Sequence, residues 1–208
     1  MKNIAIMGGT FNPIHIGHLI AAQSTSDHHM FDEIWFMPSG NPPHKEDGVI
    51  IESTHRMEMC RLATKDHPTF RISDYELKRK GKVYSVDTFA MLQKEFPENK
   101  YWLIIGTDSL FNLEKWYNHK KLLKIGAFVI VHRSGYDEEQ SLEQQARLRE
   151  CYNTSFMNVH MPQIEVSSTM IRKRIAEGKP VNYYVPDAVS DYIHKHKLYQ
   201  LGDDHEIR

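Results

Sequence analysis

The 208-residue sequence has few cysteines, no long hydrophobic run and no excess of charge of either sign. Its two cysteines, Cys60 and Cys151, stand far apart and form no CxxC pair. They predict reduced thiols in the cytoplasm rather than a disulfide or zinc framework. The apolar run at residues 4–7 is too short for a signal peptide, and no stretch approaches the ~20 apolar residues of a membrane span. Lys and Arg number 26 against 27 Asp and Glu, so we expect neither a nucleic acid nor a membrane as partner.

What is present is typical of one globular domain. Hydrophobic residues make up 40% of the chain and charged residues 25%, values that exclude a largely disordered protein. A chain of this length can bury a core without the help of a metal or a disulfide. We expect a single domain over residues 1–201 and a polar C-terminal tail at residues 202–208.

Short apolar runs alternate along the chain with longer segments of helical periodicity. The expected strands are residues 3–7, 33–37, 69–73, 101–105, 127–132 and about 157–161, and the expected helices are residues 17–26, 53–64, 85–96, 118–124, 138–152, 168–177 and 186–195. This alternation predicts an α/β fold with an open, doubly wound, mainly parallel Rossmann-like sheet flanked by helices. In such sheets ligands bind beyond the carboxyl ends of the strands, so functional residues are expected in the loops there.

The loop after the first strand has the character of a phosphate site and reads GGTFNPIHIGH over residues 8–18. Its spacing fits neither GxGxxG nor GxxxxGK[ST]. Glycines let the backbone approach a ligand closely, and the helix that follows opens with N–H groups and the positive end of its dipole. His15 and His18 are three residues apart and share one face of the first turn. Taken alone, such a pair is more often two capping or surface histidines than a binding site.

Two further loops follow strand ends. Residues 38–45, PSGNPPHK, form a rigid turn with His44 and Lys45, which alone fits a solvated loop. Residues 106–117, GTDSLFNLEKWY, end in a Trp-Tyr pair that can stack on a flat ring. Core packing is an equally good interpretation of Trp116.

The last motif, at residues 167–172, reads SSTMIR. Ser or Thr at a helix start satisfies some backbone N–H groups and leaves neighbouring amides for an anion. Arg172 stands about one turn further in, where its guanidinium can offer two donors to a phosphate. An ordinary helix cap followed by basic residues has the same pattern. The sequence has no obvious pairing of a nucleophile with a base.

Together these motifs resemble those of the nicotinate mononucleotide adenylyltransferases, a family of the nucleotidyltransferase superfamily that has the HIGH motif. HIGH stands at residues 15–18, and PSxNPPHK, GxDxxxxLxxW and SSTxIR follow in the order of the family. The similarity extends from the first strand to about residue 184. Asn12 replaces an Asp that many superfamily members have, and Ser85 replaces a frequent Thr. The resemblance implies transfer of AMP from ATP to nicotinate mononucleotide in NAD synthesis, with release of pyrophosphate.

The resemblance also implies the site residues. The catalytic residues would be His15, His18, Lys45 and Arg172, and ATP would further contact Gly8, Gly9, Thr10, Phe11, Gly106, Asp108, Ser167, Ser168 and Thr169. The mononucleotide would contact His44, Lys45, Ser85, Trp116 and Tyr117. No protein metal site is expected, because Mg²⁺ would be held by the β- and γ-phosphates of ATP.

Several alternatives stay open at this point. A pantetheine-phosphate adenylyltransferase or a cytidylyltransferase would share the first loop, although the Trp116 loop and the NPPHK turn disfavour both. A nicotinamide-preferring enzyme differs in a single substrate group, and a non-catalytic nucleotide sensor could keep the whole fold. A tRNA-synthetase-like fragment would need a KMSKS-like loop and a basic extension, and the sequence has neither. A homodimer through tyrosines such as Tyr183, Tyr184 or Tyr192 is also open.

Overall fold

The structure is a computed structural model and describes residues 1–40, 50–79, 81–133 and 138–200. The strands are β1 (Asn3–Gly9), β2 (Glu33–Pro38), β3 (Phe70–Ile72), β4 (Lys100–Gly106), β5 (Ala127–Arg133) and β6 (Ser155–Met161). The helices are α1 (Ile16–Ser26), α2 (Ser53–Thr64), α3 (Ser85–Glu95), α4 (Thr107–Asn112), α5 (His119–Ile125), α6 (Glu138–Tyr152), α7 (Ser168–Ala176) and α8 (Asp187–Lys195), with a short 3-10 helix, η1, at Leu113–Lys115. In the described part of the chain, no helix is both long enough and apolar enough to cross a membrane.

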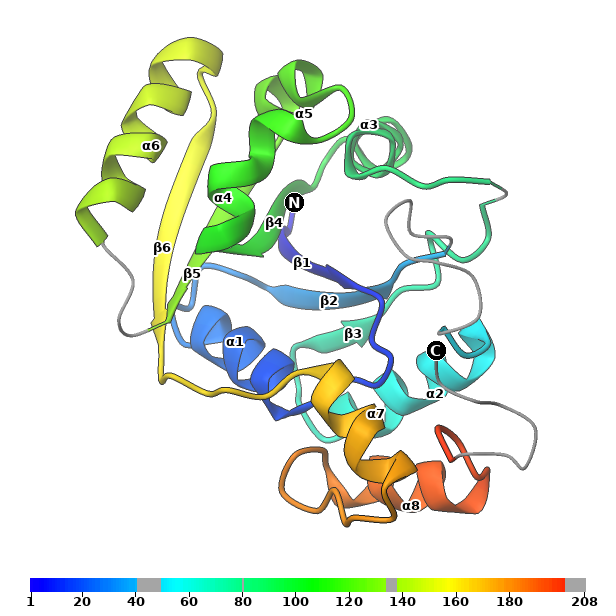
Figure 1. The fold of residues 1–208 in the computed structure, drawn as a ribbon. Coiled ribbons are helices and arrows are strands. Elements are labelled where there is room, and N and C mark those ends of the chain that lie inside the picture. The colour runs from blue at the N-terminus through cyan, green and yellow to red at the C-terminus, as the bar shows by residue number, and fades with distance from the viewer. Residues whose placement is uncertain (41–49, 80, 134–137, 201–208) are drawn as a thin grey trace.

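The strands form one parallel sheet in the order β3-β2-β1-β4-β5-β6 (Figure 1). This order is that of a doubly wound Rossmann-type sheet, so the expected fold class is confirmed. The chain runs outward from β1 to β3, then returns to the centre and runs outward again from β4 to β6. The order therefore reverses between β1 and β4, and a crevice opens at their carboxyl ends.

The sheet separates two apolar cores, because successive side chains of a strand point to opposite faces. On β1, Ala5 and Met7 belong to the core that α1, α2, α7 and α8 cover. This is the first core. Ile4 and Ile6 belong to the second core, which lies under α3, α4, α5 and α6. Figure 1 shows these two sets of helices on opposite sides of the sheet. Both faces are buried, which explains why most of the strands are near-continuous apolar runs in the sequence.

The expected strands and helices all exist, with ends that agree or shift by one or two residues, but one interpretation was wrong. Residues 106–117 were expected as a loop, and the structure forms α4 and η1 within them. α4 has only six residues, too few for intrinsic propensity to give a clear signal. Burial of Leu110 and Leu113 in the second core stabilises these turns, and this tertiary contact is not visible in the local sequence.

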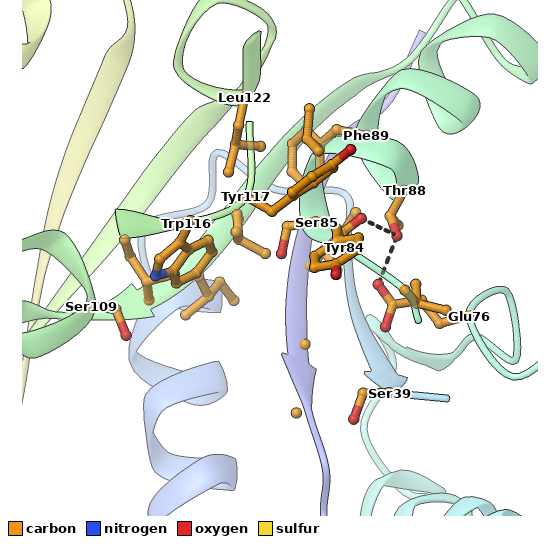
Figure 2. Close-up of a pocket in the computed structure, with 18 of the residues that line it drawn as sticks. Ser39, Glu76, Tyr84, Ser85, Thr88, Phe89, Ser109, Trp116, Tyr117 and Leu122 are labelled. Carbon is orange, nitrogen blue, oxygen red and sulfur yellow. Dashed lines mark hydrogen bonds between the residues drawn. The ribbon is translucent and has the colours of Figure 1, made fainter. Parts of the chain in front are cut away.

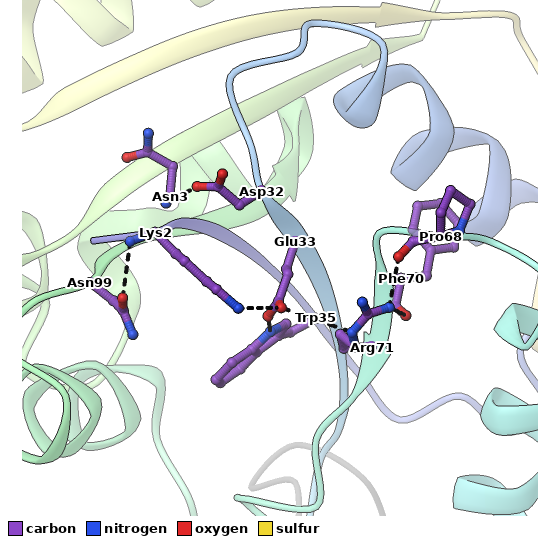
Figure 3. A network of polar contacts seen from close by, with 9 residues as sticks. All are labelled: Lys2, Asn3, Asp32, Glu33, Trp35, Pro68, Phe70, Arg71 and Asn99. Carbon is purple, nitrogen blue, oxygen red and sulfur yellow. Dashed lines mark hydrogen bonds and ion pairs between the residues drawn. The ribbon is translucent and has the colours of Figure 1, made fainter.

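The amino-terminal edge of the sheet is closed by a structural polar network (Figure 3). The Glu33 carboxylate accepts hydrogen bonds from Lys2 Nζ at 2.8 Å and from Trp35 Nε1 at 2.7 Å, and Arg71 Nε lies 3.9 Å away. Burial alone would raise the pKa of Glu33, but these donors together lower it. The charges at this edge pair with one another across β1, β2 and β3, so the edge serves stability.

Candidate active site

A cleft of about 520 Å³ lies at the carboxyl ends of β1 and β4, where the strand order reverses. This volume is within the ordinary range for a small-molecule site, about 300–1,000 Å³. Seven of the expected site residues line it, from four different parts of the chain: Gly8, Gly9, Thr10, Ser85, Gly106, Trp116 and Tyr117. Figure 2 shows Ser85 between Trp116 and Tyr84 on the cleft wall. The topology thus assembles residues that the sequence separates by more than a hundred positions.

Glycines let the two central strands end beside open space. A Cβ atom on Gly8 or on Gly106 would meet no atom within 4 Å, so a ligand in the cleft can approach both backbones closely. At Gly9 a Cβ would lie 3.1 Å from the ring of Phe11. Phe11 itself is only 2% exposed and packs in the core, so it can offer ATP only its backbone.

The two histidines of HIGH lie beside the cleft, at the start of α1, rather than in its wall. His15 is the N-cap of α1, and its ring stacks on that of His18 with centroids 3.7 Å apart. His18 Nδ1 accepts a hydrogen bond from the His15 backbone N–H at 3.3 Å. The neutral His18 ring therefore has its proton on Nε2 and is a hydrogen-bond donor there. A Cβ on Gly17 would lie 3.1 Å from the His15 ring, so glycine at this position leaves room for the stacked pair.

The start of α7 packs against the same loop. Ser167 caps the helix by accepting a hydrogen bond from Met170 N at 3.2 Å, which is the cap that the sequence predicts. Ser168 Oγ donates to the Pro13 carbonyl at 2.8 Å, and Arg172 Nη1 donates to the Asn12 carbonyl at 2.9 Å. Arg172 Nη2 also contacts Thr169 Oγ1 at 3.3 Å. The N-termini of α1 and α7 therefore share one loop, and their dipoles favour an anion between them.

Asn12 connects this loop to the C-terminal segment of the described chain. Its side-chain oxygen accepts a hydrogen bond from Tyr199 Oη at 2.9 Å and one from Ile51 N at 3.4 Å. Asn12 is 1% exposed, and burial raises the pKa of Tyr199, so the phenol is a neutral donor. An amide oxygen is sufficient to accept this bond, which explains how the chain tolerates Asn in place of the Asp that many superfamily members have.

Replacing Tyr199 with phenylalanine should therefore destabilise the fold by about 1–3 kcal/mol, because the buried Asn12 oxygen loses its shorter bond. For a domain of this size that corresponds to a fall in Tm of roughly 2–12 °C. Differential scanning calorimetry measures the shift, with Tyr183→Phe as control because Tyr183 is 89% exposed. An unchanged Tm for Tyr199→Phe would contradict the role assigned to the Tyr199–Asn12 bond.

The far end of the cleft is aromatic. Trp116 ends η1 and lines the cleft while packing partly against the second core. Tyr117 is 59% exposed and stacks on Tyr84, with ring centroids 4.2 Å apart. Ser85 is the first residue of α3, so the N-terminus of that helix opens onto the cleft. An aromatic wall beside a helix N-terminus suits a flat ring that has a negative substituent.

One of the expected site residues lies elsewhere, and two are outside the described residues. Asp108 is in the first turn of α4, exposed and outside the cleft lining. His44 and Lys45 lie outside the described residues, as do the tail residues 202–208. The remaining expected residues gather around the cleft and the β1–α1 loop, so these two neighbouring regions make up one candidate site.

Sequence reasoning missed several residues that the structure places at this site. Ser39, Glu76 and Tyr84 line the cleft, and Glu76 accepts a hydrogen bond from Thr88 Oγ1 at 2.8 Å, drawn in Figure 2. Ser39 follows β2 directly and belongs to the PSxNPPHK motif, and both were signals in the sequence. Arg56, on α2, stands in line with the buried residues of that helix, so a charged residue among apolar positions could have identified it.

The comparisons agree with this geometry. A family model described as cytidylyltransferase-like matches residues 6–174. The nicotinate-nucleotide adenylyltransferase of Bacillus subtilis is 40% identical over 200 residues, which cover 96% of this chain and 100% of that protein. A probable nicotinate-nucleotide adenylyltransferase of Lachnoclostridium phytofermentans is 41% identical over 199 residues, with the same coverage. The chain belongs to this family.

A solved structure of the family has the same fold. Plasmodium falciparum nicotinic acid mononucleotide adenylyltransferase, complexed with NaAD, aligns with a TM-score of 0.80 at 22% sequence identity, and the alignment covers 96% of this chain and 98% of that one. The same protein complexed with APC aligns with a TM-score of 0.79. The parallel six-stranded sheet and its flanking helices are thus the family's architecture.

Proposed function

We propose that the protein is a nicotinate-nucleotide adenylyltransferase, which converts ATP and nicotinate mononucleotide to nicotinate adenine dinucleotide and pyrophosphate. The observation that supports this most is the junction of two regions at the β1–α1 loop. One region has two helix N-termini with His18 and Arg172, which suits the phosphates of ATP. The other is the cleft with the Trp116 wall, which suits a pyridine ring. Relatives at about 40% identity over nearly the whole chain have this activity in their names.

The reaction is an in-line displacement at the α-phosphorus of ATP. A phosphate oxygen of the mononucleotide forms the new P–O bond, and the bond from the α-phosphorus to the bridging oxygen of pyrophosphate breaks. The attacking oxygen is already anionic near neutral pH, so no general base is needed. This agrees with the donors and cations at the start of α1 and α7, and the protein's task is to bring two polyanions into line.

Charge that develops on the transferred phosphoryl group would be stabilised from the loop side. In our proposal His18 donates from Nε2, and Arg172 and the N-terminal amides of α1 and α7 face the β- and γ-phosphates. The bonds from Arg172 to Asn12 O and Thr169 Oγ1 hold its guanidinium before ATP arrives. A guanidinium has five N–H groups, so these two bonds leave capacity for a phosphate. His15 would act by stacking on His18 and orienting it.

The ring end of the cleft would select the substrate. Trp116 would stack on the nicotinate ring, while the backbone N–H groups at the start of α3 and at Tyr117 face its carboxylate. Ser85 adds a hydroxyl at the same place. A carboxylate accepts hydrogen bonds from several N–H groups, whereas an amide presents two donors of its own that would meet N–H groups head-on. The nicotinate form is therefore the favoured substrate.

Magnesium would accompany ATP. Mg²⁺ binds phosphate oxygens and keeps several water ligands, and with ATP it supplies charge neutralisation on the β- and γ-phosphates. The described residues contain no group of three or more His, Cys, Asp or Glu side chains placed to hold a metal ion. The residues nearest the proposed phosphate positions are donors, which complement the phosphate oxygens that the cation leaves uncovered.

We also propose a cytoplasmic location. Both cysteines are free thiols, Cys60 buried and Cys151 exposed. An exposed free thiol is typical of a reducing compartment.

The direct test is pyrophosphate release with Mg-ATP. We expect kcat/KM for nicotinate mononucleotide to exceed that for nicotinamide mononucleotide by about a hundredfold or more, which is ~2.7 kcal/mol of transition-state preference. Phosphopantetheine serves as the control acceptor and should give no release above background. Equal rates with the acid and the amide would contradict the proposed carboxylate contacts and leave adenylyl transfer intact. If no acceptor gives pyrophosphate release, adenylyl transfer is contradicted and a nucleotide-binding sensor is the better interpretation.

A further inference from the structure

Arg56 ends the pairing of β1 and β2 at the edge of the site. The last backbone hydrogen bond between these strands is from Ser39 N to Gly9 O, at 2.8 Å. Immediately beyond it, Arg56 Nη1 donates to the carbonyls of both Thr10 and Ser39, at 2.8 and 2.9 Å. The guanidinium takes the place of the next rung of the ladder. It therefore determines how far apart the segments after β1 and β2 lie at the point where they leave the sheet.

The same side chain reaches a third segment. Arg56 Nε donates to the Ile51 carbonyl at 3.2 Å, and Ile51 N in turn contacts the Asn12 side chain. Ser39 and Ile51 are thus held from one guanidinium, and both are tied to the loop at residues 10–12. Three segments that the sequence separates become one rigid unit at this edge of the sheet.

Burial of the Arg56 guanidinium costs desolvation free energy, because the group is charged. Arg56 is 2% exposed, and desolvation lowers the pKa of its guanidinium. Within the described residues its hydrogen bonds all go to backbone carbonyls, and no carboxylate forms an ion pair with it. An apolar side chain would fill such a core position at less cost. A buried cation that bonds three carbonyls is therefore suited to fixing geometry rather than to adding stability.

We propose that Arg56 is a positioning residue for adenylyl transfer, which sets the spacing between the backbones at Thr10 and at Ser39 so that the two substrates meet in line. This rests on the proposed function, in which the Thr10 loop contacts ATP and Ser39 lines the mononucleotide cleft. Each loop can bind its own ligand without the other. The in-line step and the joined dinucleotide product both require the two loops at the correct separation.

The test compares Arg56→Lys with the wild-type enzyme. Lysine keeps the positive charge, but a single ammonium on a shorter side chain cannot maintain all three carbonyl contacts. We expect kcat to fall about tenfold or more, since misplacement by ~1 Å can reduce rates by about a hundredfold. KM for ATP and for nicotinate mononucleotide should each stay within about threefold. Arg56→Met, which removes the charge as well, should lower kcat further without a selective rise in either KM.

A binding measurement tests the spacing without turnover. Isothermal titration calorimetry gives Kd for a non-hydrolysable ATP analogue, for nicotinate mononucleotide and for nicotinate adenine dinucleotide. In Arg56→Lys the dinucleotide, which spans both loops, should lose about tenfold in affinity, because linked ligands bind tightly only when both sites are correctly spaced. The two separate ligands should change by less than about threefold.

The control is Met59→Ala, one turn further along α2 and fully buried in the first core. It should lower Tm at least as much as Arg56→Lys, while kcat and the affinity for the dinucleotide stay near wild type. Equal losses of kcat and of affinity for the dinucleotide in Met59→Ala and in Arg56→Lys would show that Arg56 acts through stability alone. That result would overturn the proposal. A rise in KM for ATP alone, in Arg56→Met but not in Arg56→Lys, would also overturn it, because a charge effect would then be sufficient. A wild-type enzyme that binds both nucleotides but releases no pyrophosphate would contradict the proposed function, while the dinucleotide comparison would still decide the role of Arg56.

Discussion

Replacing His18 with alanine should lower kcat by about 10²–10³, the loss typical of removing one hydrogen-bond donor to a transition state. His18 stands on the first turn of α1, where the helix N-terminus already favours negative charge. Its Nδ1 is occupied by the His15 backbone N–H, so the neutral ring donates from Nε2. Alanine removes this donor and also the ring on which His15 stacks. KM for both substrates should change much less than kcat, since the donor acts where charge develops.

The matched control for this experiment is His28→Ala. His28 is exposed just past the end of the same helix and outside the cleft lining, so the chemical change is identical and only its place differs. It should leave kcat near wild type. A folded His18→Ala enzyme with kcat within threefold of wild type would rule out the proposed role of His18. Circular dichroism and Tm establish that both variants are folded.

Local motifs were predictable from the sequence because short-range interactions decide them. The Ser167 cap follows from a hydrogen bond to Met170, three residues away. The glycines and histidines of the β1–α1 loop act within a single turn, and strand–helix alternation gives a parallel sheet through the right-handed crossover rule. These features need no knowledge of distant parts of the chain.

Long-range features of the site could not be predicted in the same way. Tyr199 meets Asn12 across 187 positions, and no local pattern predicts such a pairing. Arg56 bonds to the carbonyls of Thr10 and Ser39, just beyond the ends of β1 and β2, and a carbonyl has no residue identity that a sequence pattern could detect. α4 is stabilised by burial of Leu110 rather than by its own propensity. In each case the decisive contact joins residues that are brought together only by the tertiary fold.

The two edges of the sheet differ in how their charged side chains are paired, and this difference explains why the substrate site lies at the carboxyl edge. At the amino-terminal edge, Glu33 pairs with Lys2 and lies near Arg71. At the carboxyl edge, Arg56 and Arg172 bond to backbone carbonyls, and no carboxylate of the described residues pairs with either. Burial lowers the pKa of both guanidiniums, but arginine side chains keep their charge in proteins. The carboxyl edge therefore keeps positive charge for polyanionic substrates.

Replacing Trp116 with alanine should raise KM for nicotinate mononucleotide about 5- to 150-fold, because stacking on an aromatic side chain is worth ~1–3 kcal/mol per ring. KM for ATP should change by less than about threefold, since the proposed partner of Trp116 is the nicotinate ring and not ATP. Trp116→Phe keeps a smaller aromatic face and should give an intermediate KM. Steady-state kinetics with each substrate varied in turn gives both constants.

The comparison must separate stacking from packing, because Trp116 also touches the second core. Phe111→Ala removes a partly exposed ring from the same segment, outside the cleft lining, and should leave both KM values unchanged. If Trp116 only stabilised the fold, its loss would lower Tm and raise both constants together. A selective rise in KM for the mononucleotide, which Trp116→Phe partly reverses, requires a ring that meets the substrate. Equal changes in both constants would rule out stacking and leave Trp116 as part of the core.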